Sequence, residues 1–337
     1  MSELLEIKNL SVSFDTPRGE LQAVRDVSLS LRAGEVLAIV GESGCGKSVL
    51  CKTVMGLLPG SARIKNGSIL VEGTDITHYR RRDMDRLRGS VFSMIFQDPS
   101  AALDPTFSIG EQIAEAVAVH APKMKGAAVR GRVLELMALV GLSDPAARYK
   151  QYSWQLSGGM RQRAVMAVAL ASSPRILLAD EPTTSLDVTV QAQILDLLRD
   201  IQKKLGTATV LVSHDLGVVA RVADLVAVMY AGKIVEIGAA DEIFYDPRHP
   251  YTWGLMRSLP SMARDGEALY TIPGMPPSLI DPPAGDAFAP RNEYALAIDY
   301  EAQPPMFPIS DTHYAATWLL DDRAPKVTPP IGGGIHG

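Results

Sequence analysis

The sequence predicts an α/β fold with a mostly parallel sheet, followed by a proline-rich C-terminal extension. Short apolar runs at 35–40, 91–96, 175–179 and 209–213 are typical of strands that are buried on both faces. Segments with helical spacing of apolar residues alternate with these runs, which favours a parallel sheet. After about residue 255 the periodicity is lost and prolines become frequent, which indicates a separate, loosely packed appendage.

The remaining elements follow from local patterns. Residues 4–14 and 21–31 alternate apolar and polar side chains, as strands of a half-exposed sheet do, and the segment between them contains Pro17 and Gly19 and predicts a turn. Apolar spacing predicts helices over 48–58, over two segments between 110 and 142 that are separated near Gly126 and Gly131, and over 159–171 and 188–205.

Composition narrows the class of protein. The 337 residues are 47% hydrophobic and 21% charged, which suits a globular core, and the net charge of −5 argues against a nucleic-acid partner. The basic run between residues 80 and 88 contains two aspartates and is better explained as a solvated helix face. With two cysteines, no signal peptide and no apolar run of membrane-spanning length, we expect a reducing cytoplasmic location.

A phosphate-binding loop is predicted where the first buried strand ends. Residues 41–48 read GESGCGKS and fit the pattern G-x-x-x-x-G-K-[ST], between a predicted strand and a predicted helix. Glycines let successive N–H groups turn toward phosphates, and the helix adds its positive end. The simpler alternative is a glycine turn that matches the pattern by chance, but such a turn would not need to lie between a buried strand and a helix. The predicted ATP-binding residues are Gly41, Glu42, Ser43, Gly44, Cys45, Gly46, Lys47 and Ser48.

An acidic pair ends another buried strand. Asp180 and Glu181 follow the run ILLA, at the strand end where ligands gather in open α/β sheets. We expect Asp180 to hold Mg²⁺ through water, together with the Ser48 hydroxyl, and Glu181 to orient or deprotonate the attacking water. Such a pair is a weak signal alone, but it is specific when it accompanies a phosphate loop.

The segment LSGGMRQ at 156–162 resembles the signature sequence of ABC (ATP-binding cassette) ATPases. Ser157, Gly158 and Gly159 would begin a helix and offer N–H groups to an anion. An ordinary serine-capped helix is the simpler alternative, but two glycines in a first turn cost stability unless a backbone must approach closely. The resemblance implies that Ser157, Gly158, Gly159 and Gln162 serve the ATP of a partner subunit.

Other landmarks of that family match in order. Gln97, after the strand at 91–96, resembles the glutamine that contacts Mg²⁺ and water, and His214 resembles the switch histidine at the γ-phosphate. Residues 185–187, ending in Asp187, resemble the loop that communicates across the dimer, and Phe14 is the ring expected to stack on adenine. The resemblance covers about residues 4–240.

The resemblance also implies an architecture. We expect a P-loop NTPase of the ABC type over residues 1–255, with a RecA-like parallel core, an N-terminal antiparallel β-subdomain and a helical subdomain inserted at about 98–170. The C-terminal extension would span 256–337. Two ATP molecules would be sandwiched between two such subunits, each between a phosphate loop and the partner's signature.

The segment HPYTW at 249–253 and the tail motifs at 272–277 and 285–291 resemble ATPases of oligopeptide, dipeptide and nickel importers. The form of the tail favours an oligopeptide importer. The implied partners are a second homologous ATPase, two membrane-spanning permease subunits and an extracellular peptide-binding protein. The implied location is the cytoplasmic face of the membrane.

Many members of that group carry cysteines in the extension, thought to hold an iron–sulfur cluster. The matching positions here are Asp286, Asn292, Asp299 and Thr317, none of which supplies a thiolate. We therefore predict no cluster. A metal site built from hard oxygen ligands remains an alternative at these positions.

Three other functions remain open. The cargo could be dipeptides, nickel or another small solute, because the sequence of an ATPase does not name it. A non-transport ABC ATPase of DNA repair, chromosome organisation or translation would typically carry coiled coils, zinc modules or tandem ATPase units, and none is seen. A purely nucleotide-binding regulator is disfavoured by Glu181.

Overall fold

The computed structural model describes residues 3–184, 186–259 and 270–331. No helix within these ranges has the length and apolar character needed to cross a membrane. The first elements are β1 (Glu3–Thr16), β2 (Gly19–Arg32), β3 (Val36–Val40), α1 (Lys47–Val54), β4 (Ala62–Val71), β5 (Thr74–Asp75), α2 (Arg81–Leu87), β6 (Phe92–Ile95), α3 (Pro99–Ala102), α4 (Ile109–His120), α5 (Ala127–Leu139), α6 (Pro145–Arg148), η1 (Ser153–Gln155) and α7 (Gly158–Leu170).

The second half continues the large sheet and adds the extension. Its elements are β7 (Ile176–Asp180), α8 (Val188–Leu205), β8 (Ala208–Ser213), α9 (Leu216–Val222), β9 (Leu225–Tyr230), β10 (Lys233–Ala239), α10 (Ala240–Tyr245), α11 (Pro250–Arg257), η3 (Ala289–Arg291), η4 (Ala297–Tyr300), β11 (Phe307–Pro308), β12 (Tyr314–Ala315) and η5 (Trp318–Leu320).

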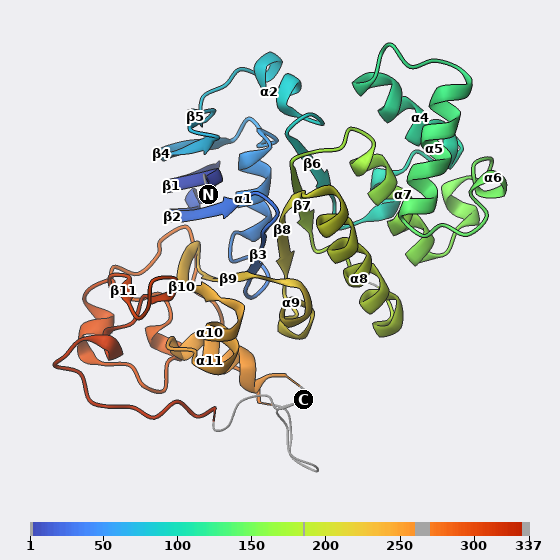
Figure 1. Cartoon of the computed structure of the whole chain (residues 1–337). Helices are drawn as coiled ribbons and strands as arrows, with labels where there is room; N and C mark the ends of the chain where they lie inside the picture. Colours follow the sequence, from blue (N-terminus) through green and yellow to red (C-terminus); the bar gives the residue numbers. More distant parts are fainter. Residues whose placement is uncertain (1–2, 185, 260–269, 332–337) are drawn as a thin grey trace.

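Two sheets organise the described chain (Figure 1). The smaller is antiparallel with order β2-β1-β4-β5. The larger has order β11-β12-β10-β9-β3-β8-β7-β6, and its strands from β9 to β6 are parallel. The α/β pattern read from the sequence agrees with this arrangement, including the N-terminal antiparallel pair.

Among the residues that the structure describes, three apolar clusters hold the layers together. The first lies between the antiparallel sheet, α1 and one face of the large sheet, and Leu50 of α1 is one of its buried members. The second packs helices α4, α5, α7 and α8 against the other face. The third joins α9, α10 and α11 to the extension, where Phe288 is 2% exposed. Burial in these clusters supplies the main driving force for folding.

The inserted helices differ from the sequence prediction in one detail. Gly126 precedes α5 with a φ of 54°, so it separates α4 from α5 as expected. Gly131, also predicted at that break, lies inside α5 instead, where its Cβ position is open and a glycine is accommodated. Figure 1 shows α4, α5, α6 and α7 gathered beside the end of the sheet that carries β6.

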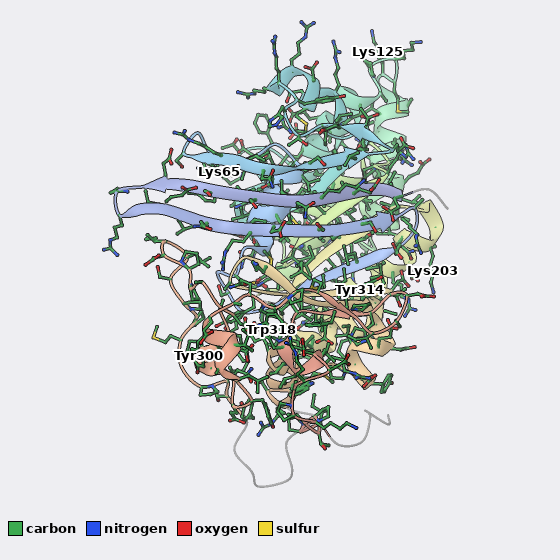
Figure 2. The ribbon with its side chains drawn as sticks, turned by 90° about the vertical axis from the view of Figure 1, so that its left-hand side faces the viewer. Lys65, Lys125, Lys203, Tyr300, Tyr314 and Trp318 are labelled. Carbon is green, nitrogen blue, oxygen red and sulfur yellow. The ribbon has the colours of Figure 1, made fainter. Side chains whose placement is uncertain are left out.

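The extension pairs with the large sheet through β12, which lies antiparallel to β10. Beside this pairing, the fully buried Glu236 carboxylate accepts the N–H groups of Arg248 (2.6 Å) and His249 (3.1 Å) and lies 2.8 Å from Nε2 of His313. Figure 2 shows the extension, with Tyr300 and Trp318, below the long strands β1 and β2. Helix α11 spans Pro250–Arg257 and therefore crosses the boundary predicted at residue 255. The division of the chain into two domains at that point stays a prediction.

Asp286, in the C-terminal extension, has a buried side chain. Its Oδ1 accepts the N–H of Phe288 at 3.0 Å. Burial, with a smaller contribution from Asp299, raises the pKa of Asp286 from 3.8 to about 6. The folded protein therefore holds this proton more tightly than the unfolded chain, and folding stability is lost as the pH rises from about 4 through 6.

Asp286→Asn should remove this pH dependence while keeping an oxygen that can accept the Phe288 N–H. Relative to the unsubstituted protein, we expect its free energy of unfolding to rise by up to about 3 kcal/mol on going from pH 4 to pH 7, the equivalent of a two-unit pKa shift. Urea unfolding across this range measures it. Asp311→Asn, at an exposed site, is the control. If the difference in free energy of unfolding between the variant and the unsubstituted protein did not change with pH, the pH dependence could not be assigned to Asp286.

Candidate nucleotide site

The phosphate loop runs from the end of β3 to the start of α1 and is shaped by two close backbone approaches. A Cβ on Gly41 would lie 2.1 Å from the carbonyl oxygen of Met229, and one on Gly46 would lie 2.3 Å from that of Ala23. Their φ values, 152° and 111°, are also in the range that favours glycine. Strands β9 and β2 therefore hold both ends of the loop.

Lys47 and Ser48 begin helix α1 and contact different partners. The Lys47 side chain is buried, and its Nζ donates to the carbonyl oxygens of Gly41 (2.7 Å) and Glu42 (2.9 Å). The Ser48 hydroxyl donates to Oδ1 of Asp180 at 2.8 Å. The loop thus brings a cation and a hydroxyl together beside the acidic end of β7.

Parallel pairing of β6, β7 and β8 brings three side chains to one edge of the sheet. Gln97 follows β6, Glu181 follows β7 and His214 follows β8. Oε2 of Glu181 accepts from Nε2 of Gln97 (3.2 Å) and from Oγ1 of Thr184 (2.8 Å), and Nδ1 of His214 lies 3.3 Å from it. One carboxylate oxygen is therefore the meeting point of all four residues.

The acidic pair has two distinct environments. Asp180 is 4% exposed, and burial raises its pKa, opposed by the hydrogen bond from Ser48. Glu181 is half-buried and has a φ of 48°, a left-handed conformation that a residue with a side chain adopts only under constraint. The constraint is visible in the Glu181 N–H, which donates to Val212 of β8 at 3.0 Å.

These groups surround one cavity of about 540 Å³. Its lining includes the loop residues Ser43, Gly44, Gly46, Lys47 and Ser48 and the polar residues Gln97, Glu181 and His214. Five of the eight predicted loop residues and the three predicted catalytic residues thus line a single space, which has the size of an ordinary small-molecule pocket, whereas Gly41, Glu42 and Cys45 are not part of its lining.

The apolar side of the cavity contains Phe14, Leu21, Ala23 and Leu279. Phe14 is half-buried and also packs against the first core cluster, so its ring is shared between core and cavity. Leu279 comes from the C-terminal extension, and its carbonyl accepts the N–H of Gln22 at 2.8 Å. No signal in the sequence connected Leu279 with this site, because the extension is brought there by folding.

The predicted signature residues lie elsewhere. Among the residues that the structure describes, the cavity lining includes none of Ser157, Gly158 and Gly159. Ser157 caps α7 by accepting the N–H of Met160 at 3.4 Å. A Cβ on Gly159 would lie 2.6 Å from Val190, so packing against α8 requires that glycine, whereas a Cβ on Gly158 would have ordinary space. Internal packing therefore explains Gly159 but not Gly158.

Gln162 and Asp187 differ from the other residues of their motifs. Gln162 is 1% exposed, so its side chain is not accessible for direct contact with a partner's nucleotide in this structure. Asp187 is exposed and caps α8 by accepting the N–H of Val190 at 3.0 Å. Its neighbour Ser185, in the same predicted communication loop, lies outside the described residues.

The donor set near the phosphate loop fits Mg²⁺. The Ser48 hydroxyl and the Asp180 carboxylate are hydrogen-bonded to each other, and both are hard oxygen donors of the kind that Mg²⁺ prefers. The side chain of Gln97 lines the same cavity. A small dication between these groups would also offset the unfavourable burial of the Asp180 charge.

The extension does not fit an iron–sulfur cluster. Each of the four residues at the matching positions uses a side-chain oxygen to accept a nearby backbone N–H. Asp286 accepts from Phe288, Asn292 from Tyr294, Asp299 from Leu296 and Thr317 from Leu319. Within the described ranges, no group of three or more His, Cys, Asp or Glu side chains is placed to hold a metal ion.

Two contacts of the site were not foreseen from the sequence. Thr184 donates to Glu181. Its position three residues after the acidic pair was the one feature of the sequence that could have indicated this contact. The phosphate-loop residue Glu42 forms an ion pair with Arg291 of the extension, which no local pattern predicts because the two are far apart in the chain.

Comparison with known proteins agrees with this geometry. Residues 24–184 match the family model described as ABC transporter, and residues 235–298 match that of the oligopeptide/dipeptide transporter C-terminal region. A solved dimeric ATP-binding cassette bound to ADP and Pi superposes with a TM-score of 0.63 at 25% identity, covering 70% of this chain and 98% of that one. The ABC-type fold expected from the sequence is thereby confirmed.

Curated relatives match over almost the whole length. The oligopeptide transport ATP-binding protein OppD of Bacillus subtilis is 54% identical over 98% of this chain and 92% of its own. The dipeptide transport ATP-binding protein DppD of Lactococcus lactis is 54% identical over 97% of this chain and 94% of its own. The expected resemblance is confirmed, and the chain belongs to the ABC transporter family, among the ATP-binding proteins of the oligopeptide/dipeptide type.

Proposed function

We propose that this chain is the ATP-hydrolysing subunit of a bacterial peptide importer. The observation that carries the proposal is the convergence of Gln97, Glu181 and His214 on the cavity that contains Lys47 and Ser48. Binding of nucleotide requires only the loop. Hydrolysis also needs a group that activates water, and the Glu181 carboxylate, contacted by three neighbours, lines the same cavity.

ATP binding follows from the loop. The N–H groups at the start of α1 and the Lys47 ammonium attract the β- and γ-phosphates, and Phe14 offers a ring to the base. Mg²⁺, held by Ser48, Asp180 and Gln97 partly through water, would neutralise charge on the phosphates. These roles follow from residue chemistry and from the positions of the side chains around the cavity.

Hydrolysis would be carried out around Glu181. Its carboxylate would orient a water molecule and accept a proton from it as the water oxygen bonds to the γ-phosphorus and the bond to the bridging oxygen of ADP breaks. Gln97 and Thr184 donate to the same carboxylate oxygen and hold its orientation. His214, whose Nδ1 lies 3.3 Å from this carboxylate, would contact the γ-phosphate.

A second subunit completes the site in this proposal. The exposed Ser157 and the half-buried Gly158 lie outside the chain's own cavity, and internal packing does not require a glycine at 158, so both residues would be available to the nucleotide of a partner. Two opposed helix starts would then stabilise the charge that develops on the transferred phosphoryl group. We propose a homologous ATPase as the partner, most simply in a heterodimer, with Asp187 near the contact.

The wider assembly follows from the relatives. Proteins named for oligopeptide and dipeptide transport share half of their residues with this chain along most of its length. We propose a peripheral location on the cytoplasmic face of the membrane, two membrane-spanning permease subunits and an extracellular peptide-binding protein. Oligopeptides are the proposed cargo, and dipeptides are the alternative that the same relatives support.

The Glu181→Gln variant tests the catalytic assignment. It keeps the size of the side chain but removes the proton acceptor, so we expect ATP binding to persist while turnover falls by roughly 10²- to 10⁴-fold. Bound ATP should then trap a closed dimer, which gel filtration with ATP would detect. Unchanged turnover would remove Glu181 from this role.

Lys47→Ala tests the phosphate loop independently of catalysis. Loss of the ammonium should weaken ATP affinity by roughly 10- to 100-fold, the worth of one or two charged hydrogen bonds. Equilibrium binding of a fluorescent ATP analogue measures it. A variant that binds ATP with the affinity of the unsubstituted protein would contradict the loop assignment.

Metal analysis tests the assignment of the extension. Protein purified without oxygen should contain no stoichiometric iron, because none of Asp286, Asn292, Asp299 and Thr317 is a thiolate. Elemental analysis together with the visible absorption spectrum would detect a cluster. A clear iron signal would overturn the prediction.

The transport role is tested by affinity purification of the tagged chain from detergent-solubilised membranes of its native host. Recovery of two polytopic membrane proteins, a second ATPase and a peptide-binding protein would support the importer. Recovery of soluble or nucleic-acid-associated proteins alone would leave the ATPase chemistry in place and point to a non-transport function.

A further inference from the structure

We infer that Arg291 of the C-terminal extension is a positioning residue for the phosphate loop, which it holds through Glu42, so that nucleotide affinity depends on the docked extension. This inference rests on the ATP site proposed above. It gives the extension a role at the nucleotide site itself, through two residues that do not line the cavity.

The contact is a two-point ion pair between distant parts of the chain. Nη1 of Arg291 lies 2.6 Å from Oε2 of Glu42, and Nη2 lies 2.8 Å from Oε1. The Arg291 side chain is 4% exposed and that of Glu42 is 27% exposed. A planar guanidinium that meets both oxygens of a carboxylate fixes its orientation as well as its position.

Arg291 is itself held firmly. Its Nε donates to the carbonyl oxygen of Pro273 at 2.8 Å, and Nη1 also donates to the Tyr230 hydroxyl at 3.2 Å. Its guanidinium carbon lies 5.7 Å from the centre of the Tyr230 ring. Contacts from the extension and from β9 thus orient the guanidinium toward the loop.

Glu42 is tied at all its polar groups. Its N–H donates to the Tyr251 hydroxyl at 2.8 Å, its carbonyl accepts from Lys47 Nζ at 2.9 Å, and its carboxylate meets Arg291. A shift of Glu42 would therefore move the backbone between Gly41 and Ser43 and displace an acceptor of Lys47. The lysine that is proposed to bind phosphate is thus coupled to the extension through one residue.

An aromatic group provides a rigid base for this coupling. Tyr230 of β9, Tyr251 of α11 and Phe288 of the extension are each no more than 2% exposed. Their ring centres lie 4.6 to 5.3 Å apart. Close packing transmits displacement, so movement of Phe288 would be felt at Tyr251 and then at the Glu42 N–H.

The extension is attached elsewhere by other contacts. Strand β12 pairs with β10, and His313 lies 2.8 Å from the buried Glu236. The Arg291–Glu42 pair is therefore not needed merely to hold the extension on the ATPase unit. The pair instead fixes the position of Glu42 in the phosphate loop, and Glu42 in turn contacts Lys47 of the proposed phosphate site.

A double-mutant cycle tests the inference on the full chain. The variants are Arg291→Gln, Glu42→Gln and both together, and the readouts are Mg²⁺–ADP affinity, the KM and kcat for ATP, and thermal unfolding. Arg257→Gln is the matched control, because Arg257 also contacts the extension, through Glu293 and Tyr270, but makes no contact with the loop among the described residues.

We expect each single substitution to weaken nucleotide binding roughly 10-fold, in the usual range of coupling between sites. The double variant should lose little more than either single one, because both remove the same contact. The loss should appear mainly in KM, with kcat changed less. Arg291→Lys, which keeps the charge but not the fork, should recover part of the affinity, and Arg257→Gln should bind as the unsubstituted protein does.

Hydrogen exchange on the unsubstituted protein gives a second test that needs no variant. Coupling is reciprocal, so Mg²⁺–ADP should slow exchange in residues 286–299 as well as in the loop. Normal nucleotide affinity in both single variants, or exchange in 286–299 that nucleotide leaves unchanged, would overturn the inference while leaving the proposed ATP site in place. Failure of the unsubstituted protein to bind nucleotide would instead overturn the proposed function.

Discussion

The close backbone packing around the phosphate loop is the constraint on which the rest of the structure depends. The carbonyl oxygens of Met229 and Ala23 leave no room for a side chain at Gly41 or Gly46. Two sheets meet at this point, because Met229 belongs to the parallel sheet and Ala23 to the antiparallel one. The loop is therefore curled by the packing of both sheets, and the orientation of Lys47 at the start of α1 follows from that curl.

The parallel sheet supplies the second part of the site by the same logic. Strands in register end at a common edge, so Gln97, Glu181 and His214 meet there although they are far apart in the chain. The left-handed φ of Glu181 is retained because its N–H is bonded to β8 and its carboxylate to three neighbours. Strain at this residue is thus offset by the surrounding order, as is common where a side chain must be preorganised.

Sequence patterns could predict those features that depend on local chemistry. The glycine spacing of the loop and the apolar runs before Asp180 and His214 locate strand, turn and helix without any tertiary knowledge, and the long amphipathic pattern at 188–205 coincides with α8. Gly131 shows where such patterns fail, because a glycine at an open position inside a helix cannot be distinguished in the sequence from a glycine that ends a helix. The domain division and the roles of the signature residues stay predictions.

Contacts set by tertiary packing could not be predicted in this way. Leu279 and Arg291 lie in a segment with little periodicity, and nothing in their neighbourhood indicates that one lines the cavity and the other meets the phosphate loop. Leu279 packs against the same apolar cluster as Phe288, and Arg291 is held by Pro273, Tyr230 and Glu42, so both positions depend on long-range contacts. An irregular extension can therefore be as much a part of a nucleotide site as the strands that carry its recognisable motifs, since contacts between distant parts of the chain decide which of its side chains reach the loop.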